Sequence, residues 1–264
     1  MTENNSFNIF SGLENLGFKD VEKVNLYSDS DKKEEQAIKE APKNDPLNFL
    51  YKKEIQCPVC STTFKSISTK VNGPRKVRTQ SDFFIEYAVV NPYFYDVWLC
   101  PNCGYATLKV DFNKISDLQR DKINKTIRPK WQNHKYPDVY DEDIAIERYK
   151  IALLNYLAMD GKSSSKAFTC LKIAWMYRLK GDSNQEIGFL TQALRGFDDA
   201  YFHEKFPIYG MDKYTMLYLL GELNRRLGNH VEALRYFGEV VTTPGVSPKI
   251  KELARDQKDV IKGV

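Results

Sequence analysis

Two Cys-x-x-Cys pairs constrain the fold of this 264-residue chain more than any other feature. The first pair is Cys57 and Cys60, and the second is Cys100 and Cys103. Four thiolates in two such pairs can surround one soft divalent metal ion in a tetrahedral site. A proline follows the first cysteine of each pair, and Gly104 follows the second pair. These residues favour tight knuckles that aim backbone N–H groups at sulfur. The pattern therefore predicts one structural Zn²⁺ bound by these four cysteines.

Other roles of the cysteines have less support from the sequence but remain open. A redox pair is usually single and begins a helix in a βαβ unit. Disulfides need an oxidising compartment, and residues 1–10 contain neither the charge cluster nor the apolar stretch of a secretory signal. Iron accepts the same four-sulfur ligand set as zinc. The fifth cysteine, Cys170, shares an apolar helical face with Leu171 and Ala174 and is predicted to be core.

Composition indicates folded units with an ample core, because 42% of the residues are hydrophobic and 13% aromatic. No apolar run approaches the roughly 20 residues that span a bilayer, so we expect a soluble cytoplasmic protein without membrane contact. The net charge of +4 is too small over this length to indicate a nucleic-acid-binding protein by itself.

Changes in composition and periodicity divide the chain into four segments. Residues 1–45 contain six lysines and ten acidic residues and are predicted to be a flexible acidic leader. Its apolar segment 7–18 is either a short docking element or a stretch that packs on its own domain. A zinc-ribbon-like β domain is expected over 46–115, a connecting segment over 116–140, and an α-helical domain over 141–264.

Strands are predicted between the two cysteine pairs. Residues 83–90 and 95–99 alternate in side-chain direction and are rich in aromatic and β-branched residues. Residues 91–92 form a predicted turn, and the second strand leads directly into the second knuckle. The gap of 39 residues between the pairs exceeds that of a minimal zinc ribbon. We therefore expect an additional strand or hairpin, with residues 72–74 as a turn.

From residue 141 onward the periodicity becomes that of amphipathic helices. A first helix is followed by short breaks and further helical runs at about 166–180, 183–200, 212–227, 230–243 and 248–262. Short links between similar helices predict antiparallel hairpins stacked side by side. The fold class expected for the whole chain is α+β.

One predicted hairpin has the spacing of a tetratricopeptide repeat. Leu217, Gly221, Ala233 and Phe237 lie at the positions where small residues allow close helix approach and bulky ones fill the space between. A weaker copy begins 46 residues earlier, at Leu171, whereas the usual period is about 34 residues. A generic helical bundle remains an alternative.

The whole arrangement resembles an uncharacterised bacterial family, the domain of unknown function 2225 family, over roughly residues 46–245. The resemblance lies in Cys57-Pro58-Val59-Cys60 followed by Phe64, in Arg78 and Asp82, in Asn91-Pro92 with Tyr95, and in Cys100-Pro101-Asn102-Cys103-Gly104-Tyr105-Ala106. It implies a zinc-ribbon-like module joined to tetratricopeptide-like helices, and it implies no known activity.

No catalytic constellation is visible. Four cysteines close the coordination shell of a metal, whereas catalytic zinc keeps an open position. His134, His203 and His230 lack any metal-binding spacing, and the chain has no phosphate-binding glycine loop and no nucleophile elbow. A catalytic site built from Arg78 and Asp82 is a weaker interpretation of these residues than a structural ion pair that holds the β module to the helices. We therefore expect no enzymatic activity.

The function favoured by the sequence is an adaptor that binds a protein or peptide partner in a helical groove. Its predicted partner-binding residues are Tyr218, Glu222, Arg225 and Arg226, a polar and aromatic set suited to an acidic peptide. The alternative for the two arginines is a solvated helix end favoured by the helix dipole.

Nucleic-acid binding by the ribbon is the alternative function. It would use the basic strip Arg75, Lys76 and Arg78 beside the rings of Tyr93, Phe94, Tyr95 and Trp98. Against this, a module of that size needs most of these rings in its core.

Overall fold

The computed structural model describes residues 45–263. Within them, small antiparallel hairpins come first and seven α-helices follow, which confirms the predicted α+β class. The predicted acidic leader with its apolar segment 7–18 lies outside the described residues, apart from its last residue.

Within residues 45–263, six strands form three separate two-stranded antiparallel sheets. The pairs are β1 (Leu50–Gln56) with β2 (Thr63–Thr69), β3 (Arg75–Thr79) with β4 (Ile85–Ala88), and β5 (Val97–Leu99) with β6 (Ala106–Leu108). The predicted strands at 83–90 and 95–99 correspond to β4 and β5, but they belong to different sheets, because the 3₁₀ helix Pro92–Tyr95 separates them. The predicted turn at 72–74 lies in the link from β2 to β3.

The helices are α1 (Asp117–Thr126), α2 (Glu142–Ala158), α3 (Ser163–Lys180), α4 (Ser183–His203), α5 (Lys213–Arg226), α6 (His230–Thr242) and α7 (Pro248–Lys262). α1 lies in the predicted connecting segment, where Ser116 and Gln119 form a capping box. Hydrophobic periodicity does not reveal such a local signal. α3 begins earlier than predicted because the carboxylate of Glu204 accepts hydrogen bonds from the N–H and hydroxyl of Ser164.

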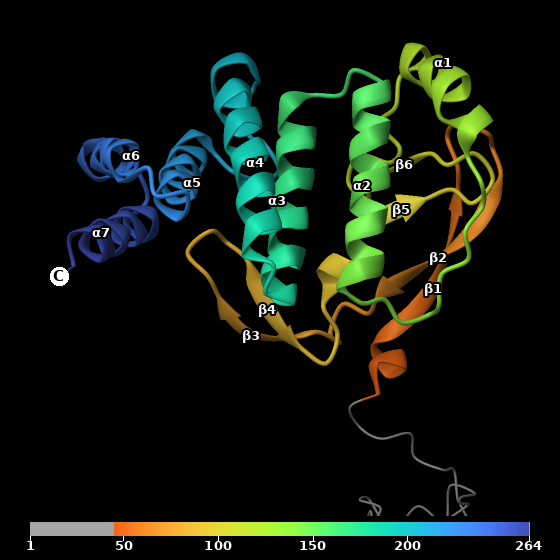
Figure 1. Ribbon diagram of the computed structural model, residues 1–264, viewed down its shortest axis with the longest axis horizontal. Coiled ribbons are helices and arrows are strands. Elements are labelled where there is room, and N and C mark those ends of the chain that lie inside the picture. Colours follow the sequence, from red (N-terminus) through yellow and green to blue (C-terminus); the bar gives the residue numbers. More distant parts are fainter. Residues whose placement is uncertain (1–44, 264) are drawn as a thin grey trace, which may run out of the picture. The chain divides into compact units, whose positions relative to one another are not determined.

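Neighbouring helices in the sequence are also neighbours in space. α2, α3 and α4 stand side by side, and α5, α6 and α7 follow beyond α4 (Figure 1). The β5–β6 hairpin lies against α2. Between residues 45 and 263, no helix is long and apolar enough to traverse a membrane.

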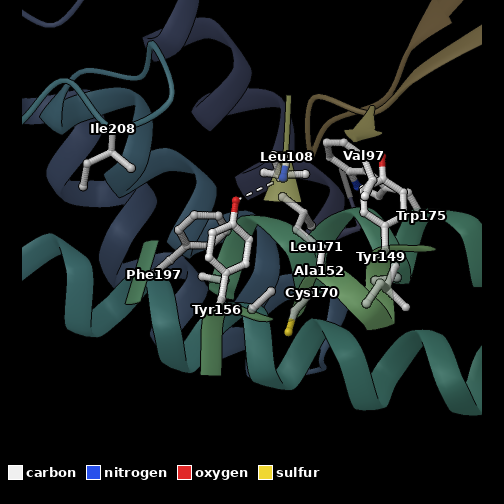
Figure 2. Packing of buried hydrophobic residues seen from close by; sticks show 14 of the residues in the cluster. Val97, Leu108, Tyr149, Ala152, Tyr156, Cys170, Leu171, Trp175, Phe197 and Ile208 are labelled. Carbon is white, nitrogen blue, oxygen red and sulfur yellow. Dashed lines mark hydrogen bonds between the residues drawn. The ribbon is translucent and has the colours of Figure 1, made fainter. Parts of the chain in front are cut away.

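The hydrophobic core is continuous from the β hairpins into the helices. One cluster of buried residues includes Cys57 and Phe84 of the β part, Trp175 of α3 and Ala254 of α7. Figure 2 shows a part of it, in which the backbone N–H of Leu108 on β6 donates to the Tyr156 hydroxyl on α2 at 3.1 Å. The predicted division of 46–264 into separate domains stays a prediction, and the core crosses its boundaries.

Candidate functional site

The four predicted metal ligands meet between the first and third hairpins. Their Sγ atoms all lie within 4.8 Å of one another. The Sγ atoms of Cys57 and Cys103 are 3.7 Å apart, and those of Cys60 and Cys100 are 3.6 Å apart. A tetrahedral ion with metal–sulfur bonds of about 2.3 Å needs sulfur–sulfur distances of roughly 3.8 Å. The cysteines can therefore hold one metal ion close to their present positions.

Each cysteine pair lies in a tight turn between two strands. The N–H of Ser61 donates to the Cys57 carbonyl at 2.9 Å, and the N–H of Gly104 donates to the Cys100 carbonyl at 3.0 Å. Ser61 and Gly104 occupy equivalent positions and both have positive φ, 58° and 74°. Glycine is required in the second turn, because a Cβ there would lie 2.7 Å from the indole ring of Trp131.

As free thiols, the clustered sulfurs alter one another's charge. Hydrogen bonds from Cys103 and Cys57 lower the pKa of Cys100 to about 2. The bond to Cys100 raises the pKa of Cys57 to about 12 and also raises that of Cys103. Burial opposes ionisation of Cys60, but its hydrogen bonds with Thr62 and Asn102 outweigh burial and lower its pKa. The cluster therefore favours ionisation of Cys100 and disfavours ionisation of Cys57 and Cys103. A bound cation would stabilise the additional thiolates by its positive charge.

Cys170 lies outside this cluster, as predicted. It belongs to α3, is 5% exposed and packs among buried side chains of the core (Figure 2). Burial alone raises the pKa of its thiol to about 11. Such a thiol acts as a small apolar side chain.

The four residues predicted to bind a partner lie on α5 and contact the chain itself. Tyr218 and Glu222 are fully buried. The Tyr218 hydroxyl donates to the Ser81 carbonyl at 2.8 Å, and the Ser81 hydroxyl donates to Glu222 at 2.6 Å. Arg225 and Arg226 donate to the two oxygens of Glu222 at 2.8 and 2.7 Å. The predicted open groove is therefore occupied by the chain's own loop between β3 and β4, and the arginines neutralise a buried carboxylate.

Asp82, in the same loop, is the second buried carboxylate at this place. Arg178 donates to Asp82 Oδ2 at 2.7 Å, Trp175 Nε1 donates to it at 3.0 Å, and the Nε of Arg226 lies 3.6 Å away. Burial opposes the charge of Asp82, but the bonds and charge of Arg178 outweigh burial and lower the pKa of Asp82. We call residues 80–84 the docking loop. We call the surface made by Trp175, Arg178, Tyr218, Glu222 and Arg226 the α3–α5 face.

Sequence reasoning missed Arg178 and Trp175 as residues of this surface. The signal was present in part, because both lie on the helix of the weaker repeat copy. Arg78 and Asp82, which the sequence suggested for a structural ion pair between the β module and the helices, have different partners. Arg78 instead pairs with Glu86 within its own hairpin at 2.7 Å. An ion pair between Asp82 and the helices does exist, but Arg178 supplies the cation.

The rings proposed for base stacking lie mainly inside the molecule. Tyr95 and Trp98 are 1% and 9% exposed. Tyr93 packs on Phe84 and Trp175, with ring centroids 5.8 and 5.2 Å apart. The basic residues of β3, which are Arg75, Lys76 and Arg78, are exposed. Of the features proposed for stacking of single-stranded nucleic acid, the basic strip is therefore exposed, whereas Tyr95 and Trp98 are buried.

The three histidines are exposed and lie on different elements. His134 follows α1, His203 ends α4, and His230 begins α6. The structure does not bring them together.

One family model matches most of the chain. A family model described as an uncharacterized protein conserved in bacteria, DUF2225, matches residues 50–261. A curated uncharacterized protein of Borreliella burgdorferi is 25% identical over 169 residues. That match covers 55% of this chain and 60% of the relative, less than two thirds of its length. No solved structure matches the chain.

Proposed function

The chain belongs to the DUF2225 family, and we propose that it is a non-enzymatic adaptor: zinc staples its β part, and its helices bind an acidic segment of a protein partner. The family description names no activity. We therefore draw the proposal from the donor set of the cysteines and from the chemistry of the α3–α5 face.

The four cysteines support zinc as a structural metal. Four thiolates at tetrahedral spacing are the usual ligands of structural zinc, and they leave no coordination position for water or substrate. Cys57, Cys60, Cys100 and Cys103 would hold the ion between two hairpins. Iron accepts the same ligands, so elemental analysis of the purified protein must decide between them.

The adaptor proposal rests on one observation. The α3–α5 face binds the docking loop through contacts that a partner segment could also make. Arg178 and Arg226 surround the carboxylate of Asp82. Tyr218 binds a backbone carbonyl and Glu222 accepts from a hydroxyl. Paired arginines, a backbone contact and an acceptor are what a surface needs to recognise a short acidic segment. A partner segment of the same chemistry would bind in place of the docking loop.

The docking loop would compete with such a partner. A tethered segment has an effective concentration in the millimolar range, so a partner must bind tightly or the loop must be loosened. Competition by the docking loop leads to a prediction that an open groove would not make. Weakening the contacts between the docking loop and the α3–α5 face should increase partner binding.

A peptide of residues 78–86 tests the proposal, with full-length protein and fluorescence anisotropy as the readout. We expect Ser81→Ala protein, which loses its hydroxyl bonds to Glu222 and Arg226, to bind the peptide at least threefold more tightly than wild type. The same peptide with Asn in place of Asp82 should bind at least tenfold more weakly, because roughly 1.4 kcal/mol corresponds to a factor of ten.

Equal affinity for the two peptides, or no binding to the Ser81→Ala protein, would remove the α3–α5 face as a partner site. Affinity capture from cells with wild-type and Ser81→Ala protein, repeated after nuclease treatment, extends the test. More protein partners with the variant would support the adaptor. Partners lost entirely on nuclease treatment would indicate nucleic acid instead.

A further inference from the structure

Arg148 of α2 is a buried cation without a carboxylate partner among residues 45–263. It is 4% exposed, and no acidic oxygen in the described part of the chain forms an ion pair with it, although the charge of the adjacent Glu147 acts on it. Arg178, Arg225 and Arg226 each have a carboxylate oxygen at 2.7 or 2.8 Å. Arg148 is therefore more deeply buried than these three partly buried arginines and lacks the ion pair that each of them has, so its charge calls for an explanation.

Part of the hydrogen-bonding capacity of Arg148 is unused within the described residues. A guanidinium has five N–H donors. Nη2 donates to the carbonyl of Val97 at 2.9 Å, and Nε is buried without a partner. The guanidinium carbon lies 5.0 and 4.9 Å from the ring centroids of Tyr136 and Tyr140. Ring faces stabilise the cation in part but accept no directed pair of hydrogen bonds.

Arg148 lines a cavity of about 310 Å³ between the β1–β2 hairpin, the segment before α2 and α2 itself. Trp131, Tyr136 and Tyr140 contribute aromatic walls, and Lys52 and Lys65 add two further cations. The one carboxylate of the lining, Asp138, is paired with Lys52 at 2.9 Å. The lining thus has three cations and one anion, an excess of two positive charges with histidine neutral.

The size and walls of this cavity distinguish between anions. A volume near 300 Å³ is at the lower end of small-molecule sites, which combine apolar walls with a few placed polar groups. Besides the rings, the lining includes Phe64, Ile67 and Leu99. Apolar walls favour an organic acid over an inorganic ion, because binding free energy is gained when apolar ligand surface is buried against them and an inorganic ion has no such surface.

We propose that this cavity binds a small organic carboxylate, with the carboxylate paired to Arg148 and the apolar body of the ligand against Trp131, Tyr136 and Tyr140. The planar fork of the guanidinium matches a carboxylate in two parallel bonds. The carboxylate of the ligand neutralises the buried charge of Arg148, and the body of the ligand fills the space between the rings. The site is separate from the α3–α5 face and adjoins the cysteine cluster, since Leu99 and Pro101, which flank Cys100, belong to its lining.

Binding to the full-length protein tests this, with benzoate as the probe and benzamide as its uncharged counterpart. We expect isothermal titration calorimetry to detect benzoate binding in the millimolar range or tighter, and at least tenfold weaker binding of benzamide. NMR should show contacts between the benzoate ring and the indole of Trp131 in the wild-type protein. Inorganic phosphate that binds more tightly than benzoate would overturn the assignment to an organic acid.

Arg148→Met is the variant that removes the charge and keeps most of the side-chain volume. It should lower the affinity for benzoate at least tenfold, whereas Arg195→Met, an exposed arginine on α4, should not change it. If Arg148→Met does not fold, Lys65→Met at the cavity rim serves instead and should weaken benzoate binding two- to threefold. Unchanged affinity in the folded variant, or equal binding of benzoate and benzamide, would contradict the proposal.

Discussion

Two buried carboxylates, Asp82 and Glu222, are surrounded by three arginines of the helices. Asp82 belongs to the docking loop and Glu222 to α5, and both side chains are fully buried. Arg178 and Arg226 bring Asp82 to the helices, while Arg225 and Arg226 neutralise Glu222. Removing one member of such a group leaves an uncompensated charge, which is strongly destabilising.

Asp82→Asn should therefore destabilise the protein by about 3–5 kcal/mol at pH 7. The pKa of Asp82 is lowered in the fold from its ordinary value of 3.8. Its contribution is thus present above that ordinary value and is lost as pH falls through the lower, folded pKa. Urea unfolding of wild type and variant from pH 6 to pH 3 should show the difference shrinking, with metal content measured at each pH. A difference that stays constant with pH would show that the charge of Asp82 is not responsible.

At the scale of elements, the α5–α6 hairpin depends on one close approach. Gly221 of α5 faces Phe237 of α6, and a Cβ at Gly221 would lie 2.8 Å from the ring. The small residue therefore lets the ring of α6 lie directly against the backbone of α5. Gly188 of α4 is a matched contrast, because a Cβ added there meets nothing within 4 Å.

The two glycines predict opposite effects of the same substitution. Alanine at an open helix position stabilises by about 0.5–1 kcal/mol, so Gly188→Ala should raise the free energy of unfolding. Gly221→Ala has the same propensity gain but forces α5 and α6 apart, which costs roughly 1–3 kcal/mol. Urea unfolding of both variants measures the signs. A stabilised Gly221→Ala protein would contradict the close packing of this hairpin.

At the scale of the whole molecule, the cysteine cluster and the helices share one core. Cys57, Cys100 and Cys103 belong to the same buried cluster as residues of α2, α3 and α5. Metal binding at four thiolates supplies folding free energy on the order of 10 kcal/mol. Loss of the metal should therefore destabilise the helices as well as the β part.

Cys100→Ser tests this coupling. We expect the variant to lose stoichiometric zinc by elemental analysis and its helical circular dichroism signal to melt at a lower temperature than in wild type. Cys170→Ala is the control, since it removes a buried thiol outside the cluster; it should keep its metal and lose only about 1 kcal/mol. A helical transition unchanged in Cys100→Ser would mean that the β part unfolds alone, and loss of metal in Cys170→Ala would show that the ligands are misassigned.

The sequence by itself determined the features that depend on nearby residues. The cysteine spacing predicted the cluster of four cysteines, which could hold a metal ion, and the 3.6-residue periodicity located α2 to α7 within a few residues. Turn residues and alternation located β4 and β5. These signals are readable because knuckles, caps and helix faces are set by residues within a few positions of one another.

Only the tertiary structure decided which segments meet. Ser81 and Tyr218 are separated by 137 positions, and Asp82 and Arg178 by 96. An exposed arginine at a helix end and one that neutralises a buried carboxylate look the same in sequence, as Arg225 and Arg226 illustrate. Arg148 likewise lies on a helix whose periodicity does not reveal a buried charge. Burial and pairing depend on the packing of distant segments, and periodicity contains no information on which distant segment covers a given face.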